Sequence, residues 1–138
     1  MKAVVFAYQD IGFVCLRELL SSGVHVSSLF THDDDPVEEI WFRRPATLAE
    51  EYGIPIYKPT TLSDNKWMSI IGEQNADFIF SFYYRYMIPR SILDFPRFAA
   101  LNLHGSLLPK YRGRAPVNWV LVNGEKETGV TLHEMIEK

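Results

Sequence analysis

Two polar residues that could do chemistry, Asn102 and His104, lie two positions apart in the otherwise apolar stretch 99–104. Alternate residues of a strand point to the same face, so we expect the amide and the imidazole to project together, with Leu101 and Leu103 on the packing face. Two N–H donors aimed at one point can hold an oxygen that gains negative charge during acyl transfer, and histidine can also pass a proton near neutral pH. The alternative is that Asn102 caps a loop and His104 binds a backbone carbonyl.

The charge around this pair favours an anionic ligand. Between residues 85 and 114 the chain carries a single acid, Asp94, and six cations, which are Arg85, Arg90, Arg97, Lys110, Arg112 and Arg114. Residues 33–39 carry five acids and no cation. A short basic stretch in a mildly acidic chain is typical of a small anionic ligand, because a long nucleic acid needs a broad basic face. Chance clustering on a solvated surface is the alternative.

Strand and helix patterns alternate along the chain, and the elements that they predict position Asn102 and His104. Apolar runs predict strands over residues 3–8, 24–30, 54–57, 77–82, 99–104 and 129–133. Helical spacing follows Asp10 as far as Gly23, and short helices are expected after Thr47, after Asp64 and over 89–93, with another from Pro116. The prediction is an α/β fold: an open, mostly parallel, Rossmann-like sheet with helices on both faces.

In such a fold the ligand lies at the carboxyl ends of the strands, near the point where the strand order reverses. Asn102 and His104 end their strand and should therefore line that crevice. The turn after the first strand contains one glycine, Gly12, where dinucleotide-binding folds carry three. We therefore do not expect NAD or FAD.

Composition limits the number of domains, the class of protein and its compartment. The chain has 138 residues, a net charge of −3 and 47% hydrophobic residues, which fits one globular domain. Its apolar runs are far shorter than a membrane span, and the amino terminus lacks the pattern of a secretory signal. The single cysteine, Cys15, fits a reducing compartment, so we expect a cytoplasmic protein without a metal site.

The segment 101–119, followed by 127–131, resembles the 10-formyltetrahydrofolate-dependent formyltransferases. The likeness extends to residues 80–85 and to the opening strand, and it covers essentially the whole chain. The Tyr83-Tyr84-Arg85 segment and the Lys110 to Arg114 loop most resemble the formyltransferase domains of bifunctional polymyxin-resistance enzymes. Those domains formylate the amine of UDP-4-amino-4-deoxy-L-arabinose, a step in lipid A modification.

This resemblance implies roles for individual residues. Asn102 would stabilise the transition state and His104 would donate a proton and bind the oxyanion. Contacts with the formyl donor, 10-formyltetrahydrofolate, would come from Tyr86, Met87, Ile88 and Arg114. The resemblance implies no metal.

The resemblance also implies that residues 1–138 are an incomplete formyltransferase N-terminal catalytic domain. The family's third catalytic residue, an aspartate, is expected a couple of residues after Lys138, and a C-terminal subdomain is expected beyond it. In the resembling enzymes a dehydrogenase domain follows the formyltransferase domain in the same chain. The expected partners are therefore such a domain or a second copy of the chain, and the expected small-molecule substrate is a UDP-amino-sugar. No nucleic acid or membrane partner is expected.

Several other functions stay open. Methionyl-tRNA formyltransferases share the Asn-x-His-x-Ser-Leu-Leu-Pro pattern. In that family the loop after the second strand is basic, whereas the corresponding loop of this chain is acidic and would repel the phosphates of tRNA. Another nucleotide sugar could be the acceptor, and water could replace the amine, which would make the protein a hydrolase of formyl-folate. The fragment could also be a non-catalytic folate-binding or nucleotide-binding module.

Three other residues carry plain interpretations. Cys15 lies on an apolar helix stripe and is expected to pack in the core. His32 follows the second strand without metal-ligand spacing to an acid, so a surface position is expected. Trp67 is expected to pack between helix and sheet.

Overall fold

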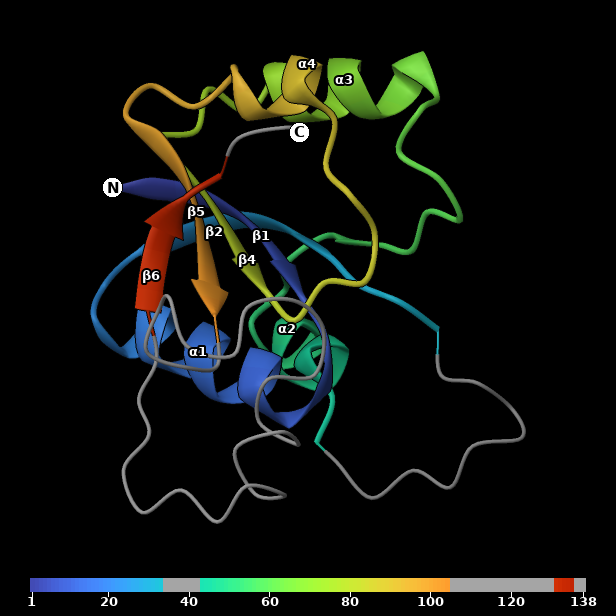
Figure 1. Cartoon of the computed structure of the whole chain (residues 1–138). Coiled ribbons are helices and arrows are strands. Elements are labelled where there is room, and N and C mark those ends of the chain that lie inside the picture. The colour runs from blue at the N-terminus through green and yellow to red at the C-terminus, as the bar shows by residue number, and fades with distance from the viewer. Residues whose placement is uncertain (34–42, 105–130, 136–138) are drawn as a thin grey trace, which may run out of the picture.

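A six-stranded sheet with helices on both faces forms the centre of the protein, in a computed structural model that describes residues 1–33, 43–104 and 131–135 (Figure 1). The strands are β1 (Lys2–Ala7), β2 (His25–Phe30), β3 (Ile56–Tyr57), β4 (Phe78–Phe82), β5 (Ala99–His104) and β6 (Thr131–Glu134). The helices are α1 (Gln9–Ser21), α2 (Pro45–Glu51), α3 (Asn65–Gly72) and α4 (Arg90–Leu93). The predicted α/β class is confirmed.

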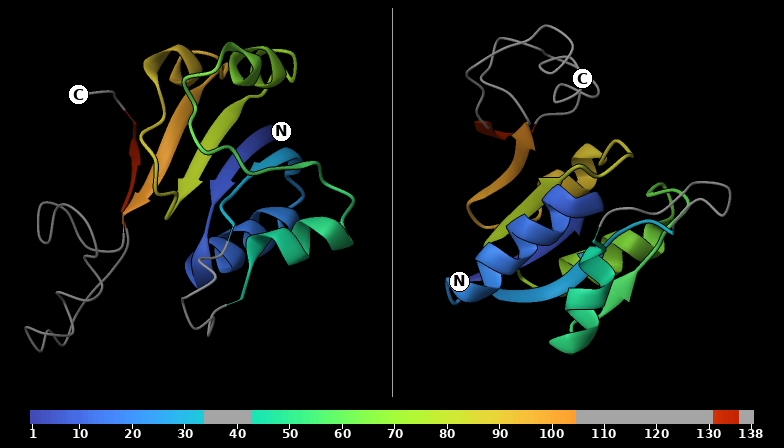
Figure 2. Two further views of the ribbon diagram at one scale, coloured as in Figure 1. Left: turned by 90° about the vertical axis from the view of Figure 1, so that its right-hand side faces the viewer. Right: turned by 90° about the horizontal axis from the view of Figure 1, so that it is seen from below.

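The strand order is β3-β2-β1-β4-β5-β6. The first five strands of this order pair in parallel, and β6 pairs antiparallel with β5 at the edge of the sheet (Figure 2). The chain builds outward from β1 to β3, then crosses back to place β4 on the other side of β1. The strand order therefore reverses between β1 and β4, and the carboxyl ends of these two strands are where a ligand is expected.

Two apolar cores sandwich the sheet, one on each face. The first packs Leu16 of α1 and Leu48 of α2 against β1, β2 and β4, and the second packs Ile71 of α3 and Ile92 of α4 against the other face. Residues 3–7 of β1 are fully buried, since helices cover both sides of this central strand. Figure 1 shows α1 and α2 on one side of the sheet and α3 and α4 on the other.

Close packing of α1 on β1 depends on Gly12. A Cβ atom at this position would lie 3.1 Å from the Ala7 Cβ and 3.2 Å from the Pro45 Cγ. Both separations are tighter than ordinary van der Waals contact, so a larger residue would push the first turn of α1 away from the sheet. Gly12 thus serves packing.

Some predicted boundaries agree with the structure. The fifth strand has the expected bounds, 99–104. Asp64 caps α3 as expected, because its carboxylate accepts a hydrogen bond from the Lys66 N–H at 3.0 Å. The helix expected from Pro116 lies outside the described residues.

Two predicted helix starts are wrong. Helix α1 is capped by Tyr8, whose carbonyl accepts the Gly12 N–H at 3.2 Å, and the Asp10 carboxylate binds Arg43 instead of the helix backbone. Helix α2 begins at Pro45, two residues before the expected cap at Thr47. Proline is favoured in a first helical turn because a backbone N–H there has no acceptor within the helix, so its absence costs nothing.

Two predicted strands also differ in extent. The strand expected over 54–57 is limited to Ile56–Tyr57, because Pro55 has no N–H to donate and the Ile54 N–H binds the Ala49 carbonyl at the end of α2. The last strand, expected over 129–133, runs over Thr131–Glu134 within the described residues.

Candidate active site

The candidate catalytic pair lies on β5. Asn102 pairs in register with Ser81 of β4 on one side and with His133 of β6 on the other. Asn102 is half-buried, so it is neither sealed in the core nor fully exposed. Leu101 and Leu103 pack against the α1 core, as expected for the opposite face of the strand.

His104 is the last residue of β5, and its backbone pairs with Thr131 of β6. It therefore stands two positions beyond Asn102 at the carboxyl end of the strand. The side chain of His104 lies outside the described part of the structure. The proposed meeting of the imidazole with the Asn102 amide stays a prediction.

The polar side of β5 faces the α3 and α4 core. Ala100, two residues before Asn102, is 3% exposed and belongs to that core, which also includes Phe6 of β1. Ser81 is buried and pairs with Phe6 on one side and with Asn102 on the other. Asn102 is therefore a half-buried member of a row that crosses the sheet from the strand-order reversal towards β6.

Aromatic residues gather where the strand order reverses. We call this group the carboxyl-edge cluster; its members, which follow β1, β2 and β4, are Tyr8, His32, Tyr84, Arg85 and Tyr86. The His32 ring stacks on Tyr84 with 4.3 Å between ring centroids, and the Arg85 guanidinium lies over the Tyr8 ring at 4.7 Å. These contacts join residues that are far apart in the sequence.

Each strand at the reversal is followed within two residues by a left-handed residue other than glycine. Gln9 after β1 has a φ of 62°, and Tyr83 after β4 also has a φ of 62°. This backbone conformation is unfavourable for residues with a Cβ and persists only where surrounding contacts hold it. The Tyr8 N–H to Phe82 carbonyl hydrogen bond, at 3.1 Å, ties the two turns together.

Burial changes the ionisation of the cluster. Desolvation, with a smaller contribution from the Arg85 charge, lowers the pKa of His32 from 6.5 to about 4. Desolvation also raises the pKa of Tyr84, with a smaller effect from Tyr86. His32 is therefore neutral and Tyr84 protonated at neutral pH.

The loop after β4 carries the three residues expected to contact formyl-folate. Tyr86 is 42% exposed and Met87 is 70% exposed, so both present apolar surface to solvent. Ile88 is 5% exposed and packs in the α3 and α4 core, so it anchors the far end of the loop. Arg114, the fourth expected contact, lies outside the described residues.

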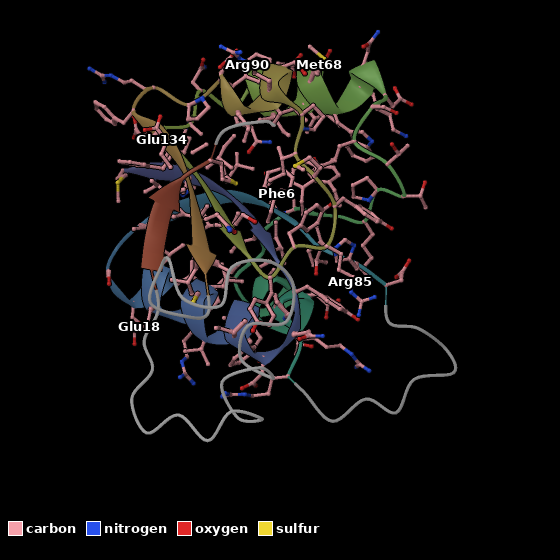
Figure 3. All side chains as sticks on the ribbon, viewed as in Figure 1. Phe6, Glu18, Met68, Arg85, Arg90 and Glu134 are labelled. Atoms are coloured by element: carbon pink, nitrogen blue, oxygen red, sulfur yellow. The ribbon has the colours of Figure 1, made fainter. Side chains whose placement is uncertain are left out.

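The described cations of the basic stretch do not gather at one place. Arg85 lies in the carboxyl-edge cluster, whereas Arg90 lies on α4 at the opposite end of the strands (Figure 3). Arg97 lies over the Phe98 ring at 5.0 Å, just before β5 begins. Among the described members of the stretch, the charge argument therefore holds for Arg85 alone.

Asp10 and Arg43 form an ion pair beside the first turn of α1. The Arg43 Nε and Nη2 atoms donate to the two carboxylate oxygens at 2.6 and 3.1 Å, and this pairing lowers the pKa of Asp10. Arg43 also lies 4.7 Å over the Phe13 ring. This arginine is therefore engaged within the protein.

Sequence reasoning missed His32, which was expected at the surface. It is half-buried in the carboxyl-edge cluster and accepts a hydrogen bond from the backbone N–H of Arg85 at 2.9 Å. A usable signal existed, because His32 and Tyr84 each lie two residues after a predicted parallel strand. Cys15, in contrast, packs against the core as expected, and burial raises its pKa to about 11.

The described residues show no site for a metal and no membrane-spanning helix. Within 1–33, 43–104 and 131–135, no three His, Cys, Asp or Glu side chains gather as metal ligands would. No helix in these ranges has the length and apolar character to cross a bilayer.

Comparison with known proteins points to one family. The profile of the family described as formyl transferase matches residues 2–138. Among solved structures, a phosphoribosylglycinamide formyltransferase from Bacillus halodurans superposes with a TM-score of 0.75 and 19% identity, over 100% of this chain and 73% of that one.

Two structures of proteins with other activities share the fold. A formyltetrahydrofolate deformylase from Pseudomonas syringae pv. tomato matches with a TM-score of 0.72 and 20% identity, over 99% of this chain and 46% of that one. A sugar 3N-formyltransferase determined in the presence of dTDP and 5-N-formyl-THF gives a TM-score of 0.65 and 21% identity, over 98% of this chain and 46% of that one. The chain thus spans about half the length of these two proteins.

Proposed function

Because the chain belongs to the formyl transferase family, we propose that it transfers the formyl group of 10-formyltetrahydrofolate to the amine of a nucleotide-linked sugar. The observation that carries this proposal is the position of Asn102. It lies half-buried near the carboxyl end of β5, in the row that leads from the strand-order reversal, with His104 two positions beyond it. This is where a fold of this kind binds its ligands.

The chemistry follows from the residue types. A bond forms between the acceptor amine and the formyl carbon, the bond from that carbon to the folate nitrogen breaks, and the proton lost by the amine goes to the folate nitrogen. The formyl oxygen gains negative charge on the way. The Asn102 amide and the His104 imidazole donate hydrogen bonds to this oxygen, and one such donor lowers a barrier by about 3 to 4 kcal/mol.

Formyl-folate fits the loop after β4. Its pterin is a flat heteroaromatic ring that needs apolar surface and backbone hydrogen-bonding groups. The exposed side chains of Tyr86 and Met87 offer the surface, and Ile88 anchors the loop in the core beside them. A contact of Ile88 with the pterin is proposed from the resemblance alone. Arg114 is proposed as a further contact.

UDP-4-amino-4-deoxy-L-arabinose is the proposed acceptor. This choice is supported by the likeness of Tyr83-Tyr84-Arg85 and of the Lys110 to Arg114 loop to polymyxin-resistance formyltransferases. A role in lipid A modification follows from that acceptor.

The test is an acceptor screen. The protein is incubated with 10-formyltetrahydrofolate and, separately, with UDP-4-amino-4-deoxy-L-arabinose, a dTDP-linked amino sugar, glycinamide ribonucleotide and methionyl-tRNA, and with no acceptor. Mass spectrometry of the acceptor detects the added formyl group. We expect the arabinose derivative to react fastest.

Each other outcome has a defined meaning. Faster formylation of another acceptor would identify that molecule as the substrate in place of the proposed sugar. Release of formate without an acceptor would identify the protein as a hydrolase of formyl-folate. Binding of 5-formyltetrahydrofolate without any transfer makes it a folate-binding module. Absence of both binding and turnover contradicts the proposal.

A further inference from the structure

His32 reaches across the end of β1 to the loop after β4. It lies two residues after β2, and in the sheet β1 separates β2 from β4. The carboxyl ends of these three parallel strands meet at one edge, so a side chain after β2 can contact the chain that leaves β4. That chain, residues 83–88, is the loop proposed to bind formyl-folate.

Three consecutive residues of this loop contact the His32 ring. The ring stacks on Tyr84 with an angle of 18° between the planes, and it meets the edge of Tyr86 at 4.7 Å between ring centroids. Between these contacts, the Arg85 backbone N–H donates to His32 Nε2 at 2.9 Å. Stacking and a hydrogen bond therefore fix the loop in position and in orientation.

The hydrogen bond requires one form of the imidazole. Because Nε2 accepts, it carries no proton, and the single proton of the neutral ring is on Nδ1. Among the described residues, the groups that face the ring are the phenols of Tyr8, Tyr84 and Tyr86 and the Arg85 cation. Burial and this cation disfavour a charged imidazole. Asp33, the next residue in the chain, forms an ion pair with Lys58 at 3.1 Å.

The loop needs such an external contact. It begins with the left-handed Tyr83 and continues to Tyr86, which is 42% exposed, and Met87, which is 70% exposed. Ile88 holds its far end in the core. The middle of the loop is held by contacts of Tyr84 and Arg85 with the rest of the carboxyl-edge cluster, and His32 makes the hydrogen bond there.

We propose that His32 is a positioning residue, whose neutral imidazole holds the 83–88 loop in the conformation that binds formyl-folate. The proposal rests on the proposed function for its ligand. His32 acts through Tyr84, Arg85 and Tyr86. It differs from Asn102 and His104, which are proposed to contact the reacting atoms.

Two substitutions at this position separate stacking from hydrogen bonding. His32→Gln places an amide oxygen near the position of Nε2 and keeps the acceptor, whereas His32→Phe keeps an aromatic ring and removes the acceptor. His25→Gln is the matched control, because His25 is exposed and begins the same strand, at its other end. Thermal unfolding of each variant establishes that it is folded.

The first readout is ligand binding. Titration with 5-formyltetrahydrofolate should give a Kd about tenfold higher for His32→Phe than for wild type, because a loop N–H loses its acceptor. His32→Gln and His25→Gln should stay within about twofold of wild type. In transfer assays the KM for 10-formyltetrahydrofolate should rise in parallel while kcat changes little, as expected for lost binding.

The second readout does not depend on folate. Hydrogen exchange of the Arg85 backbone amide, followed by NMR, should be about tenfold or more faster in His32→Phe and near wild type in His32→Gln. Unchanged exchange in His32→Phe, or a Kd equal to wild type, overturns the positioning role. If wild type does not bind 5-formyltetrahydrofolate, the proposed function fails, and the exchange data then report separately on the hydrogen bond.

Discussion

The hydroxyl of Tyr84 offers a direct test of the packing at the carboxyl edge. Its oxygen is buried and has no hydrogen-bond partner among the described residues. The Tyr84 ring itself is well packed, with His32 stacked on it at 4.3 Å and Phe6 meeting it edge-on at 5.0 Å. Tyr84→Phe removes the oxygen and keeps these ring contacts.

The expected change is a gain in stability. A buried polar group without a partner costs about 1 to 3 kcal/mol, because it gives up its hydrogen bonds to water on folding. The small cavity left by one oxygen offsets part of this gain. We expect the free energy of unfolding to rise by about 1 kcal/mol, which corresponds to roughly 3 to 5 °C in Tm for a chain of this size.

Urea denaturation gives the measurement. The midpoint of Tyr84→Phe should rise while the slope m stays unchanged, which identifies a change in stability alone. Tyr52→Phe is the control, because Tyr52 is 57% exposed and the loss of its hydroxyl should change stability by less than about 0.5 kcal/mol. A lower midpoint for Tyr84→Phe would refute the reasoning, since it would mean that the hydroxyl makes a stabilising hydrogen bond.

Three further predictions concern titration, reactivity and helix capping. The pKa of His32 is lowered to about 4, so its contribution to stability is present above pH 6.5 and is lost as the pH falls towards 4. The urea midpoint of wild type should therefore decline over this pH range, and the midpoint of His32→Gln should decline less. Burial raises the pKa of Cys15 to about 11, so at pH 8 iodoacetamide should label it more slowly than a free cysteine, as followed by mass spectrometry; labelling at the free rate would contradict this. Asp64→Ala removes the cap of α3 and should lower the free energy of unfolding by about 1 kcal/mol, and an unchanged urea midpoint would show that the cap contributes nothing.

Sequence patterns predicted several local features well. The bounds of β5 follow from an apolar run that ends at His104, and Asp64 marks the start of α3 because its carboxylate can reach a helix N–H two residues on. Alternation of strands and helices was enough to predict a mostly parallel sheet with helices on both faces. These signals are local, so a single sequence carries them.

Contacts between distant residues could not be predicted in the same way. The His32 to Arg85 hydrogen bond joins residues 53 positions apart, and it depends on the order β2-β1-β4 in the sheet. Asp10 was expected to cap α1, but its pairing with Arg43 needs the approach of the chain before α2. In both cases tertiary contacts decided between partners that are equally plausible in the sequence.

In the proposed mechanism, Asn102 stabilises the charge on the formyl oxygen. Its most direct test is the rate of formyl transfer from 10-formyltetrahydrofolate to UDP-4-amino-4-deoxy-L-arabinose by Asn102→Ala, with Asn65→Ala on the exposed first turn of α3 as control. Because Asn102 is only half-buried, the variant should unfold like wild type, and its kcat should fall about a hundredfold or more while the control keeps its rate. A folded Asn102→Ala protein with the kcat of wild type would contradict the claim.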